Sequence, residues 1–177
     1  MSLVDFIISC AGKSYWTART SSGARDWFSV ASSSDGTKLA AVAFNSYICT
    51  STDSGATWTV HSSLGAYNWE SVASSSDGTK LVAGVAYGYI YTSTDSGANW
   101  TQQTAAGSRA WRSIASSSDG TKLAAVYSGY IYTSTDSGVT WTQQSSAGSR
   151  AWESIASSSD GTKLVAGVSP GYIYTYR

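Results

Sequence analysis

The sequence has little of what most metalloproteins and nucleic-acid-binding proteins depend on. Its 177 residues include one histidine, two cysteines and one proline, and only 12% of them are charged. Lysine and arginine together number 11, as do aspartate and glutamate, so no polycationic surface is available to neutralise phosphates. A single histidine with two distant cysteines, Cys10 and Cys49, does not supply the ligands of a tetrahedral zinc site. We therefore expect no nucleic-acid partner, no metal and no cofactor.

Long apolar runs are also missing. No stretch approaches the roughly 18 residues of a membrane-spanning helix, so we expect no membrane insertion. The segment 3–10 superficially resembles a lipoprotein cleavage site, but it lacks a basic leader, and Asp5 interrupts a short apolar stretch, which favours a strand. Aromatic residues are abundant instead, with eight tryptophans and twelve tyrosines. They supply enough burial for a folded core.

A repeat dominates the chain. Four tryptophans recur at intervals of 42, 42 and 41 residues: Trp27, Trp69, Trp111 and Trp152. Each begins a unit in which Ser-Val/Ile-Ala-Ser-Ser-Ser-Asp-Gly-Thr-Lys-Leu follows closely, and a Tyr-Ile pair comes next. Repeats should be sought before anything else, because they decide the architecture.

Each unit predicts four short strands. In the first unit we expect them at 27–32, 39–44 and 47–51 and around Trp58, with Gly36 supplying the positive φ of a tight turn. No segment has a convincing helical apolar period. Four-stranded units spaced by about 40–45 residues are typical of propeller blades, which bury their aromatic residues against one another. The predicted fold is an all-β propeller of four blades, with a stacked β-solenoid as the alternative. We expect residues 1–177 to form a single domain with repeats starting near 27, 69, 111 and 152.

The segment 51–58, Ser-Thr-Asp-Ser-Gly-Ala-Thr-Trp, recurs at 93–100 and 134–141. This pattern resembles the Asp-box, or BNR, repeat of propellers such as sialidases, sortilin-type receptors and photosystem II assembly factors. The resemblance implies a structural role for nine residues: Asp53, Gly55, Trp58, Asp95, Gly97, Trp100, Asp136, Gly138 and Trp141. The residues themselves point the same way, because an Asp followed by Gly suits an Asx-type turn and one carboxylate per box is too few for calcium.

The two ends of the chain depart from the repeat. Residues 9–16 align with a degenerate box that has Ala11 and Lys13 in place of Asp and Gly, and residues 1–26 are expected to supply strands that complete the ring. The fourth unit stops at Arg177, before its last strand. Three arrangements stay open: a closed four-bladed ring, half of an eight-bladed homodimer, or a slice of a longer propeller.

The sequence argues against catalysis. Of 11 acidic residues, four belong to the Ser-Asp-Gly turns and three to the boxes. His61 is the only histidine, and no nucleophile elbow accompanies it. Glu70 and Glu153 occupy equivalent positions, so they could face each other as a glycosidase pair or could bind Arg112 of a neighbouring blade. We expect a protein that is not an enzyme.

The connections between repeats offer a candidate binding site. They place Arg25, Tyr67, Arg109 and Arg150 at equivalent positions, on the propeller face opposite the two Asp/Gly turns. Guanidinium groups there could bind an acidic protein surface, a carboxylate or a glycan. Alternatively, each Arg stacks on an aromatic neighbour and binds loop carbonyls.

The functional hypothesis is therefore a non-catalytic recognition or scaffold module for a protein or glycan ligand. One alternative is a fragment or inactive relative of a sialidase-like glycoside hydrolase, and another is a purely structural repeat protein. The resemblance slightly favours a secreted or periplasmic location. A homodimer that completes the ring is a candidate partner arrangement.

Overall fold

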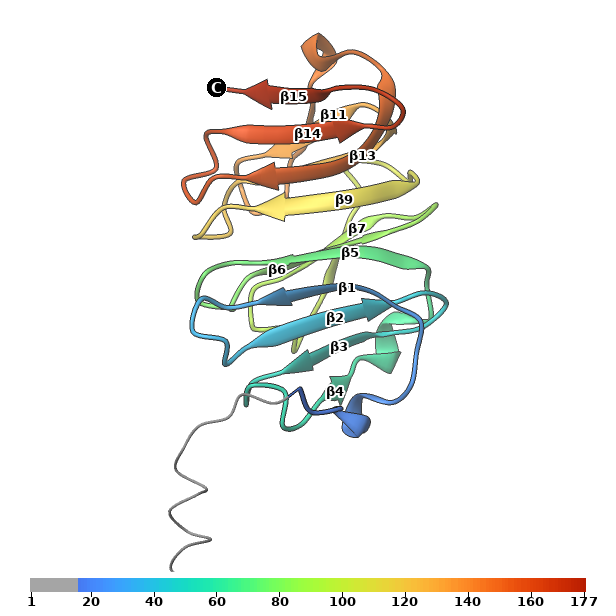
Figure 1. Ribbon diagram of the computed structural model, residues 1–177, viewed down its shortest axis with the longest axis vertical. Helices are drawn as coiled ribbons and strands as arrows, with labels where there is room; N and C mark the ends of the chain where they lie inside the picture. The colour runs from blue at the N-terminus through green and yellow to red at the C-terminus, as the bar shows by residue number, and fades with distance from the viewer. Residues whose placement is uncertain (1–15) are drawn as a thin grey trace, which may run out of the picture.

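The computed structural model describes residues 16–177, and they form an all-β protein (Figure 1). Apart from strands, this part of the chain contains three single turns of 3-10 helix, η1 (Thr20–Ser22), η2 (Ser62–Leu64) and η3 (Ser145–Ala147). The strands group into four blades in chain order. Blade 1 contains β1 (Trp27–Ser32), β2 (Leu39–Ala43), β3 (Ile48–Ser51) and β4 (Thr59–Val60); blade 2 contains β5 (Trp69–Ser74), β6 (Leu81–Val85), β7 (Ile90–Ser93) and β8 (Thr101–Gln103). Blade 3 contains β9 (Trp111–Ser116), β10 (Leu123–Gly129), β11 (Ile131–Ser134) and β12 (Thr142–Gln143); blade 4 contains β13 (Arg150–Ser157), β14 (Leu164–Val168) and β15 (Ile173–Tyr176).

Within each blade, consecutive strands pair antiparallel, as short connections require. The predicted strand positions agree with the structure to within a residue or two. A bulge follows the first tryptophan of every blade, because the pairing of the first two strands skips the next residue, which is Phe28, Glu70, Arg112 or Glu153. The four-strand unit predicted from the repeat is thus confirmed in blades 1 to 3, and blade 4 has its first three strands.

The blades stack face to face, and each blade has two different faces. The cluster between blades 1 and 2 takes Ala40, Val42 and Ile48 from blade 1 and Trp69, Val72, Leu81, Ala83, Val85 and Tyr91 from blade 2. We call the surface that a blade turns to its predecessor the Trp face and the surface that it turns to its successor the Ile face. The same combination recurs between blades 2 and 3 and between blades 3 and 4. Because the faces alternate along each strand, one four-stranded sheet supplies both.

The ends of the strands form two further surfaces. On the turn face, the box turn contacts the preceding hairpin, since Ser54 N donates to Thr37 O at 2.9 Å and blades 2 and 3 repeat this bond. On the loop face, the second hairpin of one blade bridges to the connection that enters the next, as Ser46 pairs with Tyr67 and Gly88 with Arg109. The candidate residues Arg25, Tyr67, Arg109 and Arg150 belong to the loop face.

The blades form an open arc. The inner strands β1, β5, β9 and β13 succeed one another along the long axis, while blades 1 and 4 extend toward opposite ends of the molecule (Figure 1). The expectation of a closed four-bladed ring is therefore wrong for this structure, because no described residue joins blade 4 to blade 1. Residues 16–19 lie in no strand, and the proposed strands within 1–15 lie outside the described residues.

Candidate functional site: the aspartate turns and the loop face

Each box aspartate binds within its own turn. The Asp53 carboxylate accepts from Thr57 N at 2.8 Å, Thr57 Oγ1 at 2.6 Å and Ser51 Oγ at 2.8 Å. Trp58 Nε1 donates to Gly55 O at 3.2 Å, which ties the ring to the same turn. The boxes at Asp95 and Asp136 repeat these contacts, with Asn99 in place of the threonine at Asp95. These carboxylates are occupied by turn donors, and the described residues contain no cluster of three or more metal-ligating side chains.

Hydrogen bonds keep these carboxylates ionised. Donation from Thr57 and Ser51 lowers the pKa of Asp53 from 3.8 to about 2, and the Ser33 hydroxyl and Thr37 do the same for Asp35. The pKa values of Asp77, Asp119 and Asp160, in the equivalent hairpins, are lowered as well, first by the neighbouring serine hydroxyls. A carboxylate that accepts several hydrogen bonds favours its charged form, so these groups stabilise turns.

Two of the loop-face arginines are held by their own blades. Arg109 Nε donates to Ala106 O at 2.8 Å, its Nη2 donates to Tyr132 Oη at 2.6 Å, and the guanidinium lies 4.7 Å from the Tyr132 ring centre. Arg150 Nε donates to Ala147 O at 3.1 Å and lies 4.7 Å over Tyr174. Arg25 lies 5.5 Å from the Trp27 ring. Each guanidinium therefore stacks on an aromatic ring, and in Arg109 and Arg150 part of the donor fork is already used within the blade.

Blade 2 differs, because Tyr67 stands where the other blades have arginine. Tyr67 packs edge-on to Trp69 at 5.7 Å and lies 6.0 Å from Tyr91. Beside it opens a cavity of about 360 Å³ on the loop face, lined by Ala66, Tyr67, Asn68, Val85, Ala86, Tyr87, Gly88, Tyr89, Tyr91, Gln102 and Ser108. Tyr87 stands at the rim with 81% of its surface exposed and a positive φ of 61°.

The groups around this cavity are uncharged. Tyr91 Oη donates to Gln102 Oε1 at 2.9 Å, and burial, then the adjacent Tyr67, raises the pKa of Tyr91 to about 12. The phenol is thus neutral at ordinary pH. Asn68 Oδ1 accepts from Asn45 N at 3.2 Å, so the amide is anchored to blade 1. The cavity offers aromatic faces with hydroxyl and amide groups at its edges.

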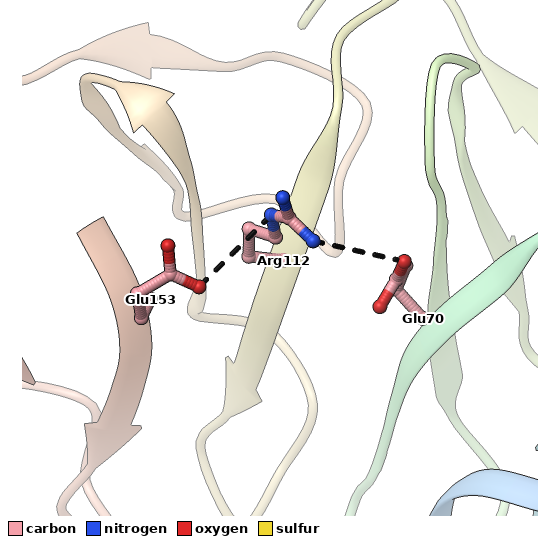
Figure 2. A network of polar contacts seen from close by, with 3 residues as sticks. All are labelled: Glu70, Arg112 and Glu153. Carbon is pink, nitrogen blue, oxygen red and sulfur yellow. Dashed lines mark ion pairs between the residues drawn. The ribbon is translucent and has the colours of Figure 1, made fainter. Parts of the chain in front are cut away.

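The remaining candidates for acid–base chemistry are engaged elsewhere. Arg112 lies on β9 between Glu70 on β5 and Glu153 on β13, at 3.9 Å and 4.0 Å (Figure 2). Of the two arrangements open in the sequence, the structure has the pairing with arginine. His61 Nε2 lies 2.8 Å from Thr50 Oγ1, and burial lowers its pKa. Gln103 and Gln144 bind the equivalent threonines in the next two blades, so the histidine replaces a structural glutamine. The imidazole is half-buried.

Of the two cysteines, Cys49 is the one that lies among the described residues. Cys49 is buried on the Trp face of blade 1, at the position of Tyr91, and burial raises the pKa of its thiol. Cys10 lies outside the described residues. Among the described residues no helix is both long and apolar enough to cross a membrane.

The fold defines the class of protein as a β-propeller, and known structures agree. The chain is similar to YCF48 bound to D1 peptide (22% identity, TM-score 0.65), covering 86% of this chain and 51% of that one. It is similar to the GH74 enzyme of Niastella koreensis (22% identity, TM-score 0.62), covering 84% of this chain and 22% of that one. The computationally designed Ika4 protein matches at 11% identity and a TM-score of 0.64, with 86% and 91% of the two chains covered.

These likenesses establish the fold. The chain spans only about a fifth of the GH74 enzymes that it matches and about half of YCF48. No protein-family model and no curated protein matches the sequence. The resemblance to Asp-box repeats therefore rests on the sequence motif and on the turn geometry described above.

Sequence reasoning missed most of the blade 2 cavity. It selected Tyr67 as a member of an arginine ring, but not Tyr87, Tyr89 or Gln102. One signal was available, because Tyr67 and Asn68 replace the Arg-Ala of blades 3 and 4 together in a single blade. In a repeat protein, several substitutions that occur together in one repeat indicate a site specific to that repeat better than the shared residues do.

Proposed function

We propose that this propeller is a non-catalytic recognition module that binds a polypeptide segment on its loop face, in the tyrosine-lined cavity of blade 2. The observation that carries the proposal is that cavity. It is open where blade 3 places Arg109 against Tyr127 and Tyr132, at 5.0 and 4.7 Å. The exchange of arginine for Tyr67 leaves an uncharged aromatic pocket in one blade.

The chemistry of the pocket supports a protein ligand. Tyrosine is enriched at protein interfaces, because it offers a large rigid contact area with one hydrogen-bonding end and loses little conformational entropy. Asn68 and Gln102 add amide groups that match the hydrogen-bonding pattern of a peptide backbone. One structural neighbour of similar fold is YCF48 bound to D1 peptide, which supports polypeptide recognition as a function of this scaffold.

The absence of catalysis is part of the proposal. The turn aspartates are saturated by hydrogen bonds, and Glu70 and Glu153 lie beside Arg112. Neither set leaves a general acid and a general base facing a common cleft, as glycoside hydrolysis needs. We further propose that the boxes at 51–58, 93–100 and 134–141 are Asp-box repeats whose role is to fasten the blades.

A glycan is the second candidate ligand. The same tyrosine rings and amides suit a neutral sugar, and GH74 enzymes are among the structural neighbours. The acidic partner predicted from Arg25, Arg109 and Arg150 has less support. Arg109 and Arg150 each bind a loop carbonyl and stack on tyrosine, and Arg25 stacks on Trp27 with a buried Nη1.

The test is to screen the whole protein against a peptide array and a neutral-glycan array, and then to measure the affinity of the best ligand by calorimetry. Tyr67→Arg restores the residue of the other blades and is expected to fill the cavity, while Tyr87→Ala removes its exposed rim. Tyr67→Arg should weaken binding by at least about tenfold, which is typical for loss of a central aromatic contact, and Tyr87→Ala, at the rim, should weaken it by a smaller factor.

Val139→Ala is the matched control, since Val139 is 63% exposed but lies on the turn face. Glycan binding that is lost in both tyrosine variants would favour the second candidate. Affinities that are equal in all four proteins would contradict the location of the site.

A further inference from the structure

The two ends of the arc expose the two faces that pair inside it. On the Ile face of blade 4, Ile173 is 75% exposed, whereas its equivalents Ile48 and Ile90 are fully buried. On the Trp face of blade 1, Val30 is 74% exposed, whereas Val72 in blade 2 is 5% exposed. At each of the three internal junctions an Ile face packs on a Trp face. The two faces exposed at the ends of the arc are therefore of the kinds that cover each other inside it.

Polar groups at the two ends are complementary in the same way. Within the arc, Val72 N donates to Ser29 Oγ, Ile114 N to Ser71 Oγ and Ile155 N to Ser113 Oγ, at 3.0–3.2 Å. A second series joins the turns, since Ser34 N donates to Ser76 O, Ser76 N to Ser118 O and Ser118 N to Ser159 O, each at 2.7 Å. The next members of both series would join blade 4 to blade 1, through Ser154 Oγ with Val30 N and through Ser159 N with Ser34 O.

Close packing between blades stops at the same point. The stem of Lys38 lies against Gly78, so that a Cβ there would meet Lys38 Cβ at 2.7 Å, and Lys80 and Lys122 repeat this contact on Gly120 and Gly161. Gly36 of blade 1 has nothing within 4 Å of the same position. Lys163 of blade 4 is exposed, as expected for a side chain whose glycine partner is missing.

A cavity marks where blade 4 lacks an outer strand among the described residues. Between blades 3 and 4 it measures about 550 Å³ and is lined in part by Leu123, Thr133, Trp152, Leu164 and Tyr174. The equivalent space between blades 2 and 3 is only about 10 Å³. There the box tryptophan Trp141 packs against the core cluster, as Trp100 does one junction earlier.

The chain carries a spare segment that fits this cavity. Trp16-Thr17 matches Trp100-Thr101 and Trp141-Thr142, and η1 follows it just as η3 follows β12. Yet Trp16 is fully exposed and residues 16–19 pair with no strand. By the register of β7 with β8, Thr17 would lie opposite Thr175 and Arg19 opposite Ile173. The spare strand and the strand edge that it fits are at opposite ends of the arc.

We propose that two copies of this chain join head to tail into a ring of eight blades. The Ile face of blade 4 in one copy packs on the Trp face of blade 1 in the other, and residues 16–19 of that second copy add a fourth strand beside β15. Trp16 fills the 550 Å³ cavity, and each of the two junctions is identical by two-fold symmetry.

A second copy fits better than the chain's own end for two reasons. Blades 1 and 4 extend in opposite directions, so the spare strand and β15 of one arc are far apart (Figure 1). Propellers typically contain four to eight blades, and two arcs of four blades reach that limit, while three would exceed it. A head-to-tail interface that failed to close would instead produce filaments.

The experiment is a measurement of the molar mass of the 177-residue protein by size-exclusion chromatography with light scattering. Protein concentrations from about 1 to 100 μM cover dimers with dissociation constants in the micromolar range or below. We expect two chains of 18.5 kDa each. A monomer throughout this range would overturn the proposal, whether it is an open arc or a ring closed on itself. A ladder of larger masses would overturn it too.

Four variants test the location of the junction. Ile173→Asp places a charge on the Ile face of blade 4 and should yield monomers, whereas Val139→Asp, on the turn face, should remain dimeric. Trp16→Ala alters a residue that is fully exposed within one chain, so folding of the arc is retained and the dissociation constant should rise at least about tenfold. Trp16→Phe should recover part of the loss. Dimerisation that is unchanged by both Ile173→Asp and Trp16→Ala would contradict this junction.

Discussion

Blades 2 and 4 have nearly the same sequence and very different surroundings. Both contain Leu-Val-Ala-Gly-Val in their second strand and Gly-Tyr-Ile-Tyr-Thr in their third. In blade 2, Val82 and Ile90 are 1% and 0% exposed, whereas the identical Val165 and Ile173 of blade 4 are 41% and 75% exposed. The difference shows that the sequence of a blade specifies its own sheet, whereas the neighbouring blade is what buries most of its apolar side chains.

The largest expected effect comes from the matched isoleucines. Ile90→Ala removes a fully buried side chain from a junction and should lower the free energy of unfolding by about 2–5 kcal/mol. Ile173→Ala should cost about 0.5 kcal/mol or less, because that side chain already contacts water. Urea titration at submicromolar protein keeps any association from adding to stability. Equal losses in the two variants would break the comparison.

A pair of turn glycines tests the contact between neighbouring hairpins. Gly36 and Gly78 have φ values of 72° and 67°, so alanine at either position carries a similar strain of about 1–2 kcal/mol. Only at Gly78 does a Cβ meet Lys38 Cβ, at 2.7 Å. Gly78→Ala should therefore lower the free energy of unfolding by about 1–3 kcal/mol more than Gly36→Ala does, by the same urea titration. Equal losses of unfolding free energy in the two variants would contradict the prediction, because they would mean that Lys38 moves away from the new Cβ without a cost in stability.

An effect of at most the same size is expected for the serines that link blades. Ser71 Oγ is buried and accepts from Ile114 N at 3.0 Å, so Ser71→Ala leaves a donor unpaired and should cost about 1–3 kcal/mol. Ser154→Ala, at the equivalent exposed position of blade 4, should change stability by less than about 0.5 kcal/mol. Thermal unfolding followed by tryptophan fluorescence would rank them, and a larger loss for Ser154→Ala would refute the ranking.

The turn aspartates should show no difference between the blades, because their bonds are local. Hydrogen bonds, first from Ser75 and Ser158, lower the pKa values of Asp77 and Asp160 in the folded protein below 3.8. Their stabilisation is fully present above about pH 4, the range of an unfolded aspartate, and is lost as the pH falls through the folded values. We expect the contribution of the aspartates to be constant from pH 7 to 5 and to be lost steadily between pH 4 and 2. His61, whose pKa is lowered by burial, should add a smaller loss of stability as the pH falls below about 6.5, and this loss is the same in the wild type and in both aspartate variants.

Asp77→Asn and Asp160→Asn each remove one titrating group and should weaken this pH dependence equally. Free energies of unfolding from urea titrations at pH 6 and pH 3 provide the measurement. A markedly stronger effect in blade 2 would show that these turns depend on their neighbours after all.

Much of the fold could be predicted because each unit encodes its own hairpins. The Ser-Asp-Gly-Thr and Ser-x-Asp-x-Gly segments fix turns through contacts within five residues, and Gly36 and Gly55 have the positive φ that such turns need. The site was less accessible. Whether a loop arginine is free for a ligand depends on the aromatic ring beside its guanidinium. Arg109 stacks on Tyr132, 23 residues away in sequence, and Arg150 stacks on Tyr174, 24 residues away, so the sequence did not reveal these contacts.

The sequence by itself determined the repeat, the four-stranded unit, the turns and the two faces of each blade, since all of these follow from short-range hydrogen bonding and from alternation along a strand. Only the tertiary structure decided the curvature of the stack, the open arc, and the cavity beside Tyr67. Those depend on how faces distant in sequence fit against one another. Identical residues are therefore buried in the core in blade 2 and exposed to solvent in blade 4.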